Sequence, residues 1–84
     1  MNIIPVSVDY GGMLLTGYAE PLENFRDSLP GRLLIYIQGR CLGTLSYSNN
    51  KWSMDKPIDP LFIKSLGDYI ASYIRSLETN GHLL

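Results

Sequence analysis

The sequence predicts an α+β fold: a five-stranded antiparallel β-meander followed by one C-terminal amphipathic helix packed on one face of the sheet. The helix is indicated by residues 60–79, whose apolar side chains fall in one sector when placed at about 100° per residue. The strands are indicated by five earlier stretches in which apolar and polar residues alternate, the period of a half-buried strand. We expect one domain, residues 1–84, with strands at about 3–10, 13–20, 32–38, 41–48 and 51–54.

The first two stretches are expected to pair as a hairpin across Gly11-Gly12. Glycine adopts the positive φ angles that a two-residue primed turn requires. With Tyr10 opposite Met13, both strands turn their apolar residues to the same face, as a sheet packed on a core requires. Pro5 has no N–H to donate, so it predicts an edge strand or a position where no ladder bond is needed.

Residues 32–38 are the strongest candidate for a central strand, because both of their faces are apolar. A plain two-residue turn after this strand sets Ile35 opposite Thr44. Apolar matching of Ile35 with Leu45 requires one more residue. We therefore expect a three-residue loop, or a β-bulge, near Gly39 to Cys41.

Asn49-Asn50 is expected to close the last hairpin, because asparagine tolerates positive φ angles. Its register sets Tyr47 opposite Trp52 and Leu45 opposite Met54, so that an aromatic pair and an apolar pair share a face. The stretch DKPIDP follows, and its two prolines end the sheet before the helix begins.

Both ends of the helix carry recognisable signals. Asp59 is expected to cap the N-terminus, and Pro60 to occupy the first helical position, where no donor is needed. Ile58 and Ile63 have the spacing of a hydrophobic staple across that cap. Gly81 is placed to end the helix in a left-handed conformation.

The connection at residues 21–31 is the longest in the chain and permits two interpretations. Phe25 and Leu29 are spaced to cover the open end of the sheet as a structural plug. Long loops also often carry function, so the same segment is a candidate binding lid. The pattern likewise leaves open whether the sheet closes into a barrel.

Composition and charge limit the classes of function. The chain of 84 residues is 45% hydrophobic and 18% charged, which is typical of a small globular domain. Seven Lys and Arg against eight Asp and Glu give a net charge of −1, which argues against nucleic acid or a membrane surface as the partner. The N-terminus shows neither a signal peptide nor a membrane span, so we expect a cytoplasmic protein.

Candidate catalytic and metal-binding residues are few. His82 is the only histidine, and a nucleophilic pair would require the C-terminal tail that holds it to dock beside the sheet. Cys41 is the only cysteine; it excludes an intramolecular disulfide and is expected to be a small core or boundary residue. One His and one Cys cannot fill a four-ligand metal site, and no phosphate-binding loop occurs. We therefore expect no enzymatic activity, no cofactor and no metal.

The face of the sheet away from the helix carries more apolar residues than a solvent-facing sheet normally has. We expect five of them to form an interface: Leu14, Tyr18, Leu34, Tyr36 and Leu42. Either the sheet curls toward a barrel and buries part of this face, or another chain packs on it. Self-association about a two-fold axis is the simplest way to cover it.

The sequence thus favours a small non-enzymatic interaction module that forms a homodimer, or docks another protein partner, through that face. The alternative is that the face binds a small ligand or single-stranded nucleic acid through its aromatic residues. Tyr18 and Tyr36 are the candidate stacking residues, with Arg32 and Lys51 as the nearest cations. No motif in the chain identifies a characterised family.

Overall fold

The structure, a computed structural model, describes the backbone of residues 3–22 and 31–81 and the side chains as far as residue 76. The elements follow in the order β1 (Ile4–Tyr10), β2 (Met13–Pro21), β3 (Arg32–Ile37), β4 (Arg40–Ser48), β5 (Lys51–Met54) and α1 (Pro60–Gly81). The strands form one antiparallel sheet in which each pairs with the next along the chain. This architecture confirms the predicted α+β fold. The proposed plug or lid formed by Phe25 and Leu29 lies outside the described residues, as does His82.

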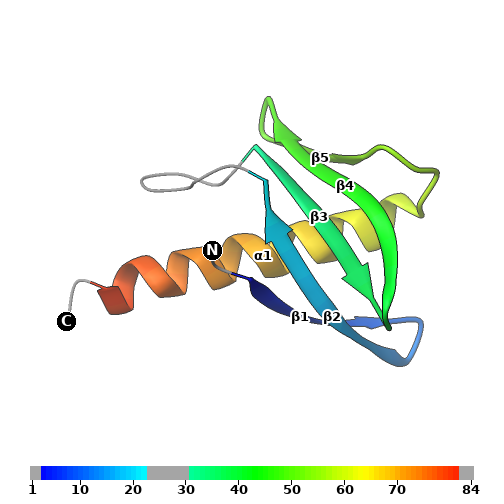
Figure 1. Ribbon diagram of the computed structural model, residues 1–84, viewed down its shortest axis with the longest axis horizontal. Coiled ribbons are helices and arrows are strands. Elements are labelled where there is room, and N and C mark those ends of the chain that lie inside the picture. The colour runs from blue at the N-terminus through cyan, green and yellow to red at the C-terminus, as the bar shows by residue number, and fades with distance from the viewer. Residues whose placement is uncertain (1–2, 23–30, 82–84) are drawn as a thin grey trace.

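The sheet curls into a half-barrel, and α1 packs against its concave face (Figure 1). The helix contacts both edge strands, β1 and β5, which do not pair with each other. The barrel therefore stays open, and the helix occupies the gap between its edges. The C-terminal part of α1 extends beyond the sheet (Figure 1). We call the sheet face toward α1 the concave face and the opposite one the convex face.

The core lies between the concave face and one stripe of the helix. Among the described residues, no polar or charged side chain is buried. The helical contribution repeats at every fourth position, because side chains four residues apart lie on one side of a helix. The buried hydrophobic side chains of the core are Ile4, Val6, Val8, Ala19, Leu33, Ile35, Ile37 and Leu45 from the sheet, and Phe62, Leu66, Ile70 and Ile74 from the helix.

Three two-residue turns join β1 to β2, β3 to β4 and β4 to β5. Both residues of each turn have positive φ: 61° and 82° in Gly11-Gly12, 55° and 81° in Gln38-Gly39, and 55° and 61° in Asn49-Asn50. Turns of this kind match the right-handed twist of the strands that they join. The expected pairs Tyr10 with Met13 and Tyr47 with Trp52 are present.

A β-bulge interrupts the pairing of β3 with β4, as the sequence predicts, but at a different position. Ile35 pairs with Gly43 and Tyr36 pairs with Cys41, so Leu42 is the extra residue. Ile35 is therefore not opposite Leu45, which pairs with Leu33 instead. The turn at Gln38-Gly39 begins one residue earlier than expected. The extra residue of the bulge compensates for this shift, so that Leu45 still lies on the same face as Leu33.

The bulge reverses two side chains relative to the expectation. Leu42 packs against the core cluster and not on the convex face, so its expected place on that face is wrong. Cys41 is exposed opposite Tyr36, so it is wrong as a core residue. Gly43 accounts for the local backbone: its φ of 130° is unfavourable for other residues, and a Cβ there would meet the Asp55 carboxylate.

Pro5 lies where no donor toward β2 is needed. Thr16 O accepts from Gln38 N–H at 2.9 Å and Leu22 N–H donates to Arg32 O at 3.0 Å, so the even-numbered residues of β2 bond toward β3. Pro5 pairs with Tyr18, which belongs to that set. Its nitrogen therefore faces the free edge of the sheet, where a proline is tolerated.

The N-terminus of α1 has the predicted cap. Leu61 N–H donates to Asp59 Oδ1 at 2.9 Å, and Ile63 N–H donates to Asp59 O at 3.0 Å. Ile58 and Ile63 are both half-buried against the core, as a hydrophobic staple requires. The helix ends at Gly81, two residues beyond the predicted 79.

Candidate functional site

The convex face holds four of the five residues predicted to form an interface. Leu14 is 64% exposed and Tyr18 is 38% exposed, whereas Leu34 and Tyr36 are half-buried. The register brings Tyr18 directly opposite Tyr36, and Leu34 lies two residues away along β3, opposite Glu20. The fifth, Leu42, is turned to the other side by the bulge.

The centre of the convex face is a row of four residues that lie opposite one another across β1 to β4: Pro5, Tyr18, Tyr36 and Cys41. The rings of Tyr18 and Tyr36 stack at 4.7 Å between centroids with an interplanar angle of 18°. The pKa of the Tyr36 phenol is raised, first by electrostatic repulsion from Cys41 and then by partial burial, so ionisation of the phenol is disfavoured. We name this row the tyrosine row.

Cys41 was not recognisable as a member of this row from the sequence. Its side-chain direction depends on where the extra residue of the bulge falls, and alternation alone permits either side. The apolar mismatch of Ile35 with Thr44 signals a bulge but not its position. The pairing of Tyr18 with Tyr36 was not predictable either, because β2 and β3 are joined by the long connection and no short turn sets their register.

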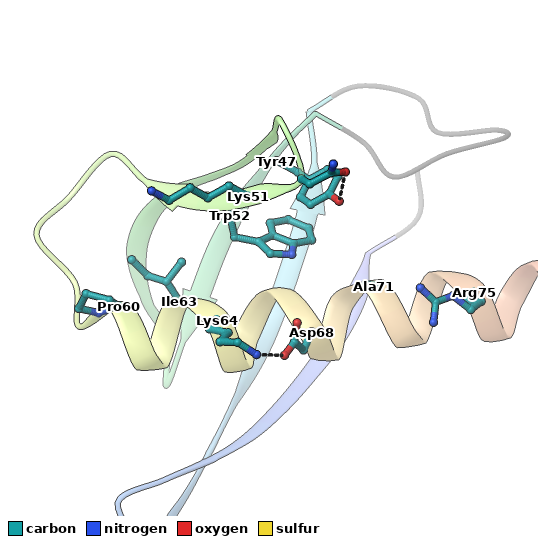
Figure 2. A pocket seen from close by; sticks show the side chains of 10 residues that line it. Tyr47, Lys51, Trp52, Pro60, Ile63, Lys64, Asp68, Ala71 and Arg75 are labelled. Carbon is teal, nitrogen blue, oxygen red and sulfur yellow. Dashed lines mark hydrogen bonds and ion pairs between the residues drawn. The ribbon is translucent and has the colours of Figure 1, made fainter.

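A groove lies on the other side of the sheet, between the β4–β5 hairpin and α1 (Figure 2). Its volume is about 520 Å³. We call it the β5–α1 groove; its lining comprises Tyr47, Asn50, Lys51, Trp52, Pro60, Ile63, Lys64, Asp68, Ala71 and Arg75. Figure 2 shows the Trp52 indole between the hairpin and the helix.

The indole of Trp52 packs directly on the helix backbone at Gly67. A Cβ at that position would lie 2.5 Å from Cγ and Cδ1 of Trp52, so only a residue without a side chain permits this approach. Trp52 also lies against Tyr47 at 4.7 Å between ring centroids. The Trp52 indole, which forms the aromatic floor of the groove, is thus fixed by contacts with both Gly67 and Tyr47.

The β5–α1 groove is rich in cations. Three of its lining residues are basic, Lys51, Lys64 and Arg75, and one is acidic, Asp68. Lys64 Nζ lies 3.1 Å from Asp68 Oδ2, an exposed pair one helical turn apart (Figure 2). Pairs of this kind contribute little to stability and leave the lysine accessible.

The opposite flank of the helix, beside β1, differs from this groove in the charge of its residues. A hollow of about 420 Å³ there is lined by Ser7, Val8, Asp9, Ser65, Asp68, Tyr69 and Ser72. Two of its lining residues are acidic, four carry a hydroxyl group, and none is basic. The two flanks of α1 therefore differ in charge.

A mainly apolar hollow of about 550 Å³ lies at the end of the half-barrel where α1 begins. Its lining comprises Tyr10, Leu15, Ile37, Gln38, Arg40, Leu42, Pro57, Ile58, Asp59 and Phe62. The Tyr10 phenol donates a hydrogen bond to Asp59 Oδ2, which lowers the pKa of Asp59 and raises that of Tyr10. The Asp59 carboxylate is thus engaged by this phenol and by the helix cap, which makes it a poor general base.

Within residues 3–22 and 31–76, no three His, Cys, Asp or Glu side chains gather as metal ligands would. No helix in the described part of the chain is both long enough and apolar enough to cross a membrane. Comparison with known proteins finds no protein-family model that matches the chain, and no significant match to a curated protein or to a solved structure. Function must therefore be inferred from the surface features described above.

Proposed function

We propose that this chain is a small non-enzymatic interaction module that associates with a second copy of itself through the convex face of its sheet. The stacked pair of Tyr18 and Tyr36 in the middle of that face carries the proposal. Both lie in strand interiors, where a sheet face that meets only solvent normally carries polar residues. Leu14 and Leu34 enlarge the apolar area on either side of the pair.

A second copy is a suitable occupant for two reasons. An isologous contact needs one surface that is complementary to itself, and a two-fold axis near the tyrosine row would bring each copy's Tyr18 and Tyr36 together. The net charge of −1 produces little repulsion between copies. Because two convex surfaces touch only near their centres, the buried area is small and we expect dissociation in the micromolar range.

The oligomeric state in solution tests this proposal. We expect sedimentation equilibrium of the parent protein to show a monomer–dimer equilibrium at micromolar concentration. The variant Tyr18→Thr/Tyr36→Thr should be a folded monomer, because threonine keeps strand propensity and the concave core is untouched. Met13→Thr is the matched control: Met13 is also an exposed apolar strand residue, 62% exposed, but lies outside the tyrosine row, and its loss should leave the dimer intact.

Two results would contradict the proposal. One is a parent protein that remains monomeric throughout the concentration series. The other is a double variant that still dimerises as the parent does.

The alternative of single-stranded nucleic acid on the same face has one supporting feature, its two adjacent aromatic rings. The rings stack on each other, which removes ring area from a nucleobase. The acidic residues Asp9 and Glu20 share the convex side of β1 and β2, where a phosphate backbone would need cations. A fluorescence titration with oligothymidylate at low salt distinguishes the two, and we expect no binding.

A further inference from the structure

The strand β5 has an unpaired edge beside the helix. In β4, Tyr47 N–H donates toward β3, whereas Thr44 O accepts from Asp55 N–H on the β5 side at 3.2 Å. Backbone groups along a strand alternate between its two neighbours. Residues of β4 with even numbers therefore bond to β5, and Trp52 and Met54 direct their N–H and C=O groups to the free edge.

We propose that the β5–α1 groove binds an extended acidic peptide segment of another protein, which adds to the free edge of β5 as a further strand. Strand addition supplies main-chain hydrogen bonds to Trp52 and Met54, and alternate side chains of the peptide point into the groove. This site is separate from the tyrosine row, so the inference goes beyond the self-association proposed above.

The groove has the shape and floor that such a segment requires. Its volume of about 520 Å³ can accommodate a few side chains of a bound peptide. Trp52, Ile63 and Ala71 provide an apolar floor, and all three are only partly buried. Since Gly67 fixes the indole of Trp52 on the helix, the floor is formed before any peptide arrives, which lowers the entropy lost on binding.

Charge selects an acidic segment. Of the six Lys and Arg residues whose side chains the structure describes, three line this groove, against one of the five Asp and Glu residues described in the same way. The groove is therefore basic although the whole chain is slightly acidic. Carboxylates spaced along the peptide would meet Lys51 at the hairpin and Lys64 on the helix, and complementary charge also fixes register.

The other edge of the sheet does not offer the same opportunity. In β1, Pro5 removes a donor from the free edge, a common way of protecting an edge from strand addition. The neighbouring hollow contains Asp9 and Asp68 and no basic residue, so an acidic segment is repelled there. The two edges thus differ in both hydrogen bonding and charge.

Amide NMR titration with a model peptide tests the inference. The probe is a blocked peptide that alternates Glu and Val, and the matched control peptide alternates Lys and Val. We expect the acidic peptide to shift the Trp52 indole resonance and to slow hydrogen exchange at the Trp52 and Met54 amides. The Lys-Val peptide should leave these signals unchanged.

Charge variants locate the contact. Lys51→Glu/Lys64→Glu should weaken binding of the acidic peptide about tenfold, as expected for two exposed charge contacts reversed. Lys56→Glu is the matched control, because Lys56 is exposed but does not line the groove, and it should bind as the parent does. The variant Tyr18→Thr/Tyr36→Thr should also bind the peptide as the parent does, which separates this site from the dimer surface.

Three outcomes would overturn the inference: no shift at millimolar peptide, equal binding of the two peptides, or shifts confined to residues of β1. Equal binding by the parent and the Lys51→Glu/Lys64→Glu variant would also count against it.

Discussion

At the scale of single residues, Gly67 decides how closely the sheet approaches the helix. Gly67→Ala should lower the free energy of unfolding by about 1–3 kcal/mol through overpacking, since the new Cβ would lie 2.5 Å from the Trp52 ring. Alanine favours a helix over glycine by up to about 1 kcal/mol, which offsets part of the loss. Urea denaturation measures the net effect. Ser65→Ala on the exposed side of α1 is the control and should be close to neutral. A Gly67→Ala protein more stable than the parent would show that the indole does not rest on the helix.

The hydrogen bond from Tyr10 to Asp59 predicts a dependence of stability on pH at both extremes. The pKa of Asp59 is lowered in the folded state, so its contribution is present above the ordinary value of about 4 and is lost as pH falls through the folded pKa. The pKa of Tyr10 is raised, so its contribution is present below about 10 and is lost as pH rises through the folded pKa.

Tyr10→Phe tests this linkage while keeping the edge-to-face contact with Phe62, whose ring centroid lies 5.2 Å away. We expect the variant to be less stable than the parent at neutral pH, with a smaller loss of stability toward both acid and alkaline conditions. Urea denaturation across the pH range measures the two profiles. Parallel profiles for the two proteins would show that the phenol does not influence Asp59.

At the scale of secondary-structure elements, the stripe of α1 that enters the half-barrel holds the fold together. Ile70 is fully buried in the middle of this stripe. Ile70→Asp places a carboxylate in an apolar environment at a cost of several kcal/mol, comparable with the total stability of about 5 kcal/mol expected for a small domain. We expect no cooperative thermal transition by circular dichroism. Ser72→Asp, an exposed position two residues away, should remain folded. A cooperative transition of Ile70→Asp near that of the parent would contradict this packing.

At the scale of the whole molecule, the protection of backbone amides against hydrogen exchange should rise from the edges of the sheet to its centre. Leu33 and Ile35 are fully buried in the central strand, and their amides bond toward β4. We expect these two amides to exchange only through global unfolding. The amides of Trp52 and Met54 face the free edge and should exchange fastest among the strand residues of β5. Hydrogen exchange followed by NMR measures these rates, and equal protection of the two pairs would mean that the edge of β5 is covered.

The elements of this fold follow from signals that are local in the chain. A turn needs only residues that accept positive φ, as Asn49-Asn50 does, and a helix start needs only a cap such as Asp59. Register follows from the same turns for β1 with β2 and for β4 with β5, which is why the pairs Tyr10 with Met13 and Tyr47 with Trp52 are correct. No short turn joins β2 to β3, so the pairing of Tyr18 with Tyr36 is set by the folded sheet. The position of the bulge is not local in this sense. Alternation cannot distinguish an extra residue at Cys41 from one at Leu42.

The sequence by itself determined the elements, their order and the registers on either side of Gly11-Gly12 and Asn49-Asn50, because each depends on residues within a few positions of one another. Tertiary structure decided the rest. The side of Leu42 depends on the contact of Gly43 with Asp55, and the shape of the β5–α1 groove depends on Trp52 meeting Gly67. Both contacts join segments that are separate in the sequence. They form only once the sheet has curled and the helix has packed against it. The sequence around either residue of such a pair does not indicate which residue it will contact.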